Sequence, residues 1–180
     1  NKNANIPAEG QVYVSGYEMP HLTTGNTYVE HVVSADGKKV LNYAIEWNGK
    51  MNHSRWVAYS YDAITGVKNV NRSDDAWAVD PLLPVEMQVD NSWHTNDGFD
   101  RGHLCASDDR VFSSEANKQT FYFSNLSPQF NSFNGGYWVT FEQLVNSWVR
   151  KDNAFGSVYD KIYVAKGGTL DKLLVNYKGT

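Results

Sequence analysis

Residues 98 to 104 read Gly-Phe-Asp-Arg-Gly-His-Leu and bring a carboxylate, a guanidinium and an imidazole within four positions. In an extended strand, alternation points Arg101 and His103 to the same side, and Gly102 between them leaves room for a ligand to approach the backbone. Arg binds phosphate oxygens with a fork of donors, and His, with an ordinary pKa of about 6.5, can take a proton from water near neutral pH. Asp100 could orient this arrangement through hydrogen bonds. The segment therefore has the residue types that phosphodiester hydrolysis needs.

A second group of polar residues follows in Asn125-Leu126-Ser127-Pro128-Gln129, in Asn134-Gly135-Gly136-Tyr137-Trp138 and at Glu142. Together with Asp100 to His103, these segments resemble the DNA/RNA non-specific endonucleases of the ββα-metal class. The pattern of that family is Asp-Arg-Gly-His, then Asn-x-x-Pro-Gln, then Asn-x-Gly-x-Trp, and then Glu on a helix. The resemblance covers about residues 55 to 165 and implies a nuclease that acts on both DNA and RNA.

The resemblance also implies roles for individual residues. His103 matches the general base that takes a proton from the attacking water. Asn134 matches the single protein ligand of a divalent cation, normally Mg²⁺, for which Mn²⁺ could substitute. A lone amide suits Mg²⁺, which dehydrates reluctantly and keeps several waters. Glu142, eight residues further along the expected helix, could hold a water bound to the metal.

Four further positions are implied by the family pattern. Asn125 matches a residue that supports the site, and Asp100 and Arg101 match its orienting and phosphate-facing members. Arg72 matches, more loosely, an upstream arginine that stabilises the extra negative charge of the transition state. The chain departs from some members at Asn146, where they carry an Arg, so a second phosphate contact would be absent or supplied elsewhere.

Each of these residues also has a plainer interpretation. His103 could be a structural histidine in a turn, Asn134 an N-cap before a helix, and Glu142 a solvated helix residue. The other histidines, His21, His31, His53 and His94, are expected to be ordinary surface or strand residues. Cys105, two residues after His103, is expected to be a small buried hydrophobe rather than a nucleophile. If His103 is the base, activity should fall below about pH 6 as its imidazole is protonated.

Two other classes of function remain open. One is a catalytically silent binding module on the same fold, which would use its many aromatic side chains for carbohydrate or protein contacts. The presence of both His103 and Asn134 argues against it. The other is a zinc hydrolase, which is weaker because the chain has neither HExxH nor paired cysteines.

Net charge limits how the chain could hold nucleic acid. Sixteen Lys and Arg against twenty Asp and Glu leave a charge of −4, which excludes the strongly basic surface of a protein that coats nucleic acid. Positive charge at the site would have to come from the metal ion and from Arg72 and Arg101.

The elements that would position these residues indicate an α+β fold with a central antiparallel β-sheet and few helices. Runs rich in β-branched and aromatic residues predict strands over 28–33, 39–47, 56–61, 121–123 and 161–165. Turn signals at Asp36-Gly37 and Asn48-Gly49 separate the first three strands, and residues 64 to 99 are expected to be a long irregular connection. Within residues 113–119, Ser113 and Ser114 stand in capping position before a short polar helix.

The clearest helix is predicted over residues 136 to 151, with basic residues in its last turn. Its apolar residues fall at helical spacing on one face and are expected to pack in the core. They are Tyr137, Phe141, Leu144, Val145, Trp148 and Val149.

The chain is expected to comprise a loose N-terminal segment, residues 1–23, and one nuclease domain over residues 24–180. No apolar run approaches the about 18 residues that span a bilayer, and no signal peptide is visible. The first residues, Asn1-Lys2-Asn3, suggest that something upstream was removed, and the resemblance favours a bacterial extracellular or periplasmic location. The apolar run at 173–177 suggests that a longer polypeptide was cut after Thr180, so that a C-terminal fragment would be a partner.

Overall fold

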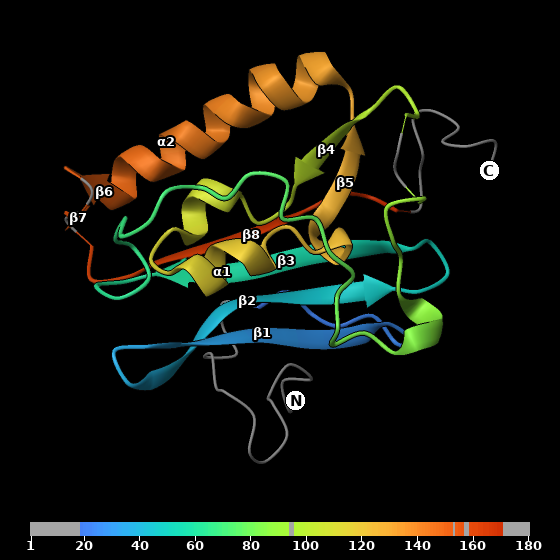
Figure 1. The fold of residues 1–180 in the computed structure, drawn as a ribbon, viewed down its shortest axis with the longest axis horizontal. Helices are drawn as coiled ribbons and strands as arrows, with labels where there is room; N and C mark the ends of the chain where they lie inside the picture. The colour runs from blue at the N-terminus through green and yellow to red at the C-terminus, as the bar shows by residue number, and fades with distance from the viewer. Residues whose placement is uncertain (1–18, 94–95, 153, 157–158, 171–180) are drawn as a thin grey trace.

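The computed structural model describes residues 19–93, 96–152, 154–156 and 159–170. Four strands form one antiparallel sheet in the order β1-β2-β3-β8 (Figure 1), so the expected central sheet is confirmed. Their bounds are Thr27–Ala35 for β1, Lys38–Asn48 for β2, His53–Tyr61 for β3 and Ile162–Gly167 for β8. His94, most of the segment 1–23 and the apolar run at 173–177 lie outside the described residues.

The two expected turns differ in geometry. Asp36 and Gly37 both have positive φ, at 49° and 71°, and join β1 to β2 as a two-residue type I′ hairpin. The second turn is longer than Asn48-Gly49 alone predicts. The side chain of Asn48 accepts hydrogen bonds from the amides of Lys50 and Met51, and the left-handed residue is Asn52, with φ of 48°.

One face of the sheet carries the main core. Alternate residues of β2 and β3 point to this face, where they meet Leu83 from the long connection and Val149 from the last helix. Cys105 is fully buried in this cluster, and burial raises its pKa to about 12, so the expectation of an inert hydrophobe is confirmed. The buried members are Val29, Tyr43, Ile45, Trp47, Val57, Tyr59, Tyr61, Leu83, Leu104, Cys105 and Val149.

Above this core lies a unit of two short strands and a helix. The strands β4, Asp100–His103, and β5, Leu126–Gln129, pair antiparallel, and the helix α2, Val139–Val149, lies across the top of the molecule (Figure 1). This is the ββα arrangement that the resemblance implied.

Short elements complete the described chain. The short helix expected here is α1, Ser114–Gln119. Of the two serines in capping position, Ser113 is the cap, because its side chain accepts a hydrogen bond from the amide of Ala116. The strand expected over 121–123 is wrong, since only Tyr122 forms an isolated bridge, with Ala78. The other elements are η1 (Val85–Met87), η2 (Ser107–Arg110), η3 (Phe123–Asn125), β6 (Arg150–Lys151) and β7 (Ala154–Phe155).

The expected helix over 136–151 begins earlier and ends sooner. Residues 131–132 are already helical, and the helix passes through a π-helical segment, η4, over Phe133–Trp138. It continues as α2 and ends at Val149, where the chain turns into β6. Asn134 lies inside the π-helical segment and makes no side-chain cap, so its interpretation as an N-cap is wrong. Wide turns of this kind recur at functional sites.

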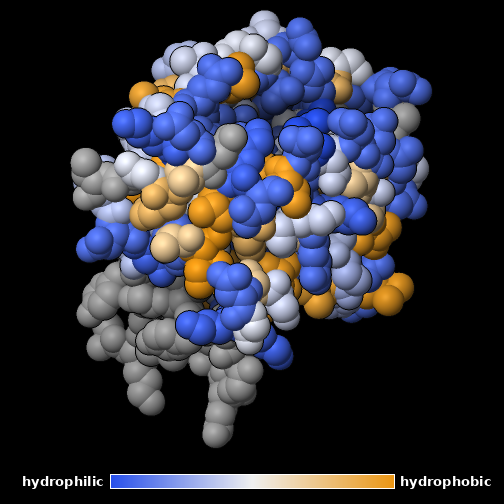
Figure 2. Space-filling view, turned by 60° about the vertical axis from the view of Figure 1, so that its left-hand side comes forward, coloured by the Kyte–Doolittle hydropathy of each residue, from blue (hydrophilic) through white to orange (hydrophobic). Residues whose placement is uncertain are grey.

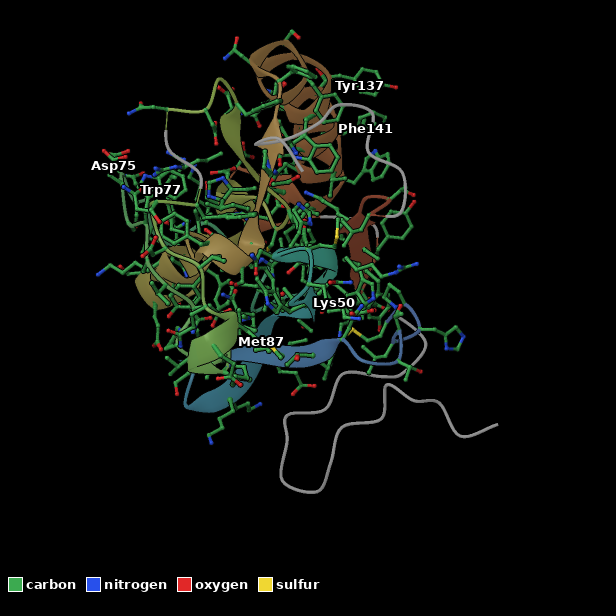
Figure 3. All side chains as sticks on the ribbon, turned by 90° about the vertical axis from the view of Figure 1, so that its right-hand side faces the viewer. Lys50, Asp75, Trp77, Met87, Tyr137 and Phe141 are labelled. Atoms are coloured by element: carbon green, nitrogen blue, oxygen red, sulfur yellow. The ribbon has the colours of Figure 1, made fainter. Side chains whose placement is uncertain are left out.

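The apolar face of this helix is also not where the pattern placed it. Val149 is buried and Val145 packs against the core, but the other four residues are exposed. Figure 3 shows Tyr137 and Phe141 together on the outer side of α2, away from Trp77. Apolar side chains also reach the surface among hydrophilic ones on the face seen in Figure 2. The four exposed residues are Tyr137, Phe141, Leu144 and Trp148.

The long connection over 64–99 is irregular, as expected, and a buried carboxylate fastens it to the sheet. Asp80 Oδ2 lies 2.9 Å from His31 Nε2 on β1 and accepts a hydrogen bond of 2.5 Å from the hydroxyl of Ser124. Burial alone would raise the pKa of Asp80, but the contacts with His31 and Ser124 hold it below its ordinary value. His31 is therefore a buried anchor rather than an ordinary strand residue.

We expect Asp80→Asn to lower the free energy of unfolding by about 1.5–3 kcal/mol, because it removes hydrogen bonds to a buried charge. Since the pKa of Asp80 is lowered in the fold, the stabilisation is present at neutral pH and is lost as the pH falls through the folded-state value. Urea denaturation at pH 7 measures the effect. Asp74→Asn, at a carboxylate that is 96% exposed, should change stability by less than about 0.5 kcal/mol. Equal stability of the two variants would contradict the anchoring role.

Candidate active site

An open cleft of about 680 Å³ lies between β4, the long connection, the start of η2 and the helix formed by η4 and α2. Residues from all these regions line it, although they are up to 74 positions apart in the chain (Arg72 to Asn146). The cleft collects every predicted site residue except Asn125. The predicted residues that line it are Arg72, Asp100, Arg101, His103, Asn134 and Glu142.

Aromatic packing fixes the position of the His103 ring. The ring centroid lies 5.6 Å from that of Trp77 and 5.1 Å from that of Phe121. The indole nitrogen of Trp138 donates a hydrogen bond of 3.1 Å to the backbone carbonyl of His103 and ties β4 to the start of α2. Nε2 of His103 is buried and has no hydrogen-bond partner among the described residues. The imidazole is therefore placed by rings rather than by a carboxylate.

The surroundings of His103 keep it neutral. Burial, and next the positive charges of Arg72 and Lys166, lower its pKa from 6.5 to about 3. In the free protein, the His103 imidazole is therefore uncharged at any ordinary pH. The expectation that its protonation limits activity below about pH 6 does not fit this environment.

Gly102 was expected to leave room for a ligand, but it makes room for a neighbouring side chain instead. A Cβ atom built there would lie 2.1 Å from Cδ of Gln129, on the strand paired with β4. The space in front of Gly102 is therefore filled by a side chain of the protein and is not left for a ligand. Arg101 and His103 do point to the same side, since both contact the Trp77 ring.

Asp100 links the two halves of the family motif. Its Oδ2 accepts hydrogen bonds of 3.0 Å from the side-chain amides of Asn131 and Asn134. The bond from Asn134 Nδ2 fixes the rotation of that amide, and no described residue engages its Oδ1. Asp100 thus orients Asn134 and leaves the carbonyl oxygen able to bind a cation.

Two arginines supply positive charge to the cleft. Nε of Arg72 donates a hydrogen bond of 2.6 Å to Ser107 Oγ, and its guanidinium lies over the ring of Phe121. The Arg101 guanidinium lies 4.9 Å from the centre of the Trp77 ring and donates to the side chain of Asn91. Because guanidinium groups bind phosphate oxygens, both residues have the chemistry expected of them.

Glu142 is a half-buried carboxylate at the wall of the cleft. Burial raises its pKa from 4.5 to about 7, while the charge of Lys166 opposes the rise and Asp109 adds to it. Oε1 of Glu142 is buried, has no hydrogen-bond partner among the described residues, and lies 3.8 Å from Lys166 Nζ. The interpretation of Glu142 as a solvated helix residue is therefore wrong.

Asn125 lies behind the cleft and is fully buried. Its Oδ1 accepts a hydrogen bond from the amide of Cys105, and its Nδ2 donates to the carbonyls of Cys105 and Thr120. These bonds hold the chain just after His103. Asn125 thus contacts the site only through the backbone, and its supporting role stays a prediction.

Several residues of the site carry no motif that could reveal them. Trp77 lies between Arg101 and His103, Ser107 holds Arg72, and Lys166 stands between Glu142 and Asp109. Asn146, at the position of the expected family Arg, donates to Asp109 and accepts a hydrogen bond of 2.6 Å from Arg150. For Lys166 the sequence did offer a signal, because a lysine on the half-buried side of the otherwise apolar strand β8 interrupts the apolar pattern.

Comparison with known proteins agrees with this geometry. The sequence model described as DNA/RNA non-specific endonuclease matches residues 24–175. Nuclease 1, mitochondrial, of Schizosaccharomyces pombe is 37% identical over 174 residues, covering 81% of this chain and 53% of that protein. Nuclease C1 of Cunninghamella echinulata var. echinulata is 30% identical over 142 residues, covering 76% of this chain and 55% of that protein.

More distant proteins show the same likeness. Nuclease EXOG, mitochondrial, of Xenopus laevis is 24% identical over 136 residues, covering 76% of this chain and 36% of that protein. A chain in the crystal structure of the EndoG/EndoGI complex is similar with a TM-score of 0.59 and 26% identity, covering 76% of this chain and 52% of that one. The chain thus spans from about a third to just over half of the length of these relatives. The family match over most of the sequence and the cleft that gathers its motif residues show that the chain belongs to the DNA/RNA non-specific endonuclease family.

Proposed function

We propose that this chain carries the site of a magnesium-dependent, sugar-non-specific endonuclease that hydrolyses phosphodiester bonds of DNA and RNA. The observation that carries the proposal is the convergence of a neutral imidazole, an oriented amide, a carboxylate and two guanidinium groups on one cleft. His103, Asn134 and Glu142 supply the first three. Such a set can activate water, hold a cation and bind phosphate within one site.

The residues present fit a hard divalent cation. Asn134 offers a carbonyl oxygen whose rotation Asp100 fixes, and Glu142 offers a buried carboxylate oxygen without a hydrogen-bond partner among the described residues. Oxygen donors of this kind suit Mg²⁺, and Mn²⁺ shares the preference. We therefore propose that Asn134 is the protein ligand. When bound, the cation would neutralise charge on the phosphate and the leaving oxygen.

The other residues have separate roles in the proposed reaction. Arg72 and Arg101 bind the non-bridging phosphate oxygens and hold the phosphorus near His103. His103 takes a proton from the attacking water, whose oxygen bonds to phosphorus while the bond to the leaving oxygen breaks. The anionic phosphodiester offsets the charges of Arg72 and Lys166, so its arrival raises the proton affinity of His103.

The acidic limb of the pH profile should belong to Glu142 rather than to His103. With the pKa of Glu142 raised to about 7 and that of His103 lowered to about 3, acidification protonates the carboxylate first. We expect kcat/KM at limiting Mg²⁺ to fall as the pH drops below about 7, and the limb to move to lower pH as Mg²⁺ is raised, because a cation favours the carboxylate.

Glu142→Gln should lower the rate and abolish this limb, because an amide does not titrate in this range. Rates measured from pH 4.5 to 8 on both proteins test the assignment. A limb that persists unchanged in Glu142→Gln would assign it to another group.

Plasmid cleavage tests the proposed function. Purified protein with Mg²⁺ or Mn²⁺ should nick supercoiled plasmid and degrade RNA, and EDTA should stop both reactions. Intact substrates under all these conditions would contradict the nuclease and favour the silent binding module.

No helix in the described part of the chain has the length and apolar character needed to cross a membrane. Several relatives are named mitochondrial nucleases, whereas others carry no location in their names. The extracellular or periplasmic location therefore stays a prediction. A C-terminal fragment as partner is likewise untested.

A further inference from the structure

A buried lysine stands directly behind the cleft and does not line it. Nζ of Lys166 lies 3.8 Å from Glu142 Oε1 and 3.6 Å from Asp109 Oδ2, and its side chain is only 12% exposed. The ammonium also lies 5.6 Å from the centres of the Trp138 and Tyr59 rings. It therefore separates two carboxylates in a space that is otherwise walled by aromatic rings.

The strand β8 explains how this lysine reaches the site. Lys166 pairs with Val57 at the edge of the sheet, and its side chain shares the half-buried side of the strand with Ile162 and Val164. These two neighbours pack on the main core. A lysine here breaks an apolar pattern, and burying its charge costs free energy unless the charge is paired.

Asp109 is the fixed end of this arrangement. It is fully buried, its Oδ2 accepts a hydrogen bond of 2.5 Å from Tyr59, and its Oδ1 accepts one of 2.9 Å from Asn146. Burial alone would raise the pKa of Asp109, but Lys166 and Tyr59 hold it below the ordinary value. Asp109 is thus an anchored anion that keeps the lysine in place.

Glu142 is the other end, and besides Lys166 the side chain of Trp138 contributes a hydrogen bond to its carboxylate. Its Oε1 has no hydrogen-bond partner among the described residues, so the nearby ammonium is the main charged group that can hold this carboxylate at the wall of the cleft. The charged and titratable groups around Lys166 are Asp109 from η2, Glu142 from α2 and Tyr59 from β3. Its charge also acts on His103 of β4 and on the buried thiol of Cys105.

We propose that Lys166 is a positioning residue, which holds the Glu142 carboxylate in its working place by bridging it to the buried anion Asp109. The inference rests on the proposed nuclease function and extends it to a residue outside the cleft. A simpler interpretation is that an inward-pointing lysine only protects the edge strand from pairing with another chain. The two differ in whether the effect of Lys166 passes through Glu142.

A double-mutant cycle separates these interpretations. We expect Lys166→Met to lower kcat for plasmid cleavage about 10- to 100-fold, the range typical of residues that orient a metal site, with KM for DNA close to that of the wild type. In the Glu142→Gln background the same change should have little further effect. Lys166→Arg should restore most of the rate, because a guanidinium can bridge both carboxylates.

The controls keep the result interpretable. Lys161→Met alters an exposed lysine close to the start of β8 and should leave kcat unchanged. Thermal unfolding shows whether each variant is folded, and Lys166→Gln replaces Lys166→Met if the latter does not fold. A wild-type rate in the folded Lys166 variant, or the same fold loss in both backgrounds, would overturn the positioning role. An inactive wild type would instead overturn the nuclease proposal, and the positioning role with it.

Discussion

His103→Ala should lower the turnover of plasmid cleavage by about 10²–10⁴-fold, the usual contribution of a general base. No other described side chain that lines the cleft is a neutral base at pH 7, and the imidazole is kept neutral by burial and by Arg72 and Lys166. Because the ring is held by aromatic packing, its removal should leave Asn134 and the arginines in place. Initial rates on supercoiled plasmid at saturating Mg²⁺ measure the effect.

His21→Ala is the matched control for this variant. His21 is exposed and far along the chain from the motif, so its removal should leave the rate unchanged. A rate for His103→Ala within about threefold of the wild type would be incompatible with transfer of a proton to this imidazole.

Asn134→Ala should raise the Mg²⁺ concentration needed for half-maximal activity by at least about 100-fold, above the range seen when only a partner of a metal ligand is removed. The expectation follows from the free amide oxygen of Asn134 and from the hydrogen bond that orients it on Asp100. Rates measured across a Mg²⁺ titration give the value.

Asn131→Ala is a useful comparison, because Asn131 donates to the same oxygen of Asp100 but does not line the cleft. It should raise the half-saturating Mg²⁺ concentration far less than Asn134→Ala. Similar Mg²⁺ dependence of Asn134→Ala and the wild type would exclude Asn134 as a ligand.

Much of this site could be predicted from the sequence because its central residues come in short segments. Alternation along 100–103 correctly placed Arg101 and His103 on one side, and the strand patterns predicted the main sheet. The motif segments at 125–129 and 134–138 then indicated which distant residues belong together.

Other features depend on contacts between segments that no local pattern describes. The space at Gly102 is filled by Gln129 from the neighbouring strand. The neutral state of His103 results from burial beside Trp77 and Phe121 and from the positive side chains of Arg72 and Lys166, which are distant in the sequence. The apolar stripe of α2 showed the correct spacing for a helix, but the orientation of the helix leaves Phe141 at the surface. Hydrophobic periodicity indicates that one face of a helix is apolar, but it does not indicate whether the protein core or solvent lies against that face.

Calorimetric Mg²⁺ titration of His103→Ala and Asn134→Ala distinguishes a general base from a metal ligand in the same cleft. We expect His103→Ala to be inactive but to bind Mg²⁺ as the wild type does, and Asn134→Ala to bind Mg²⁺ far more weakly or not at all. Equal Mg²⁺ binding by Asn134→Ala and the wild type, or loss of binding in His103→Ala, would contradict these roles.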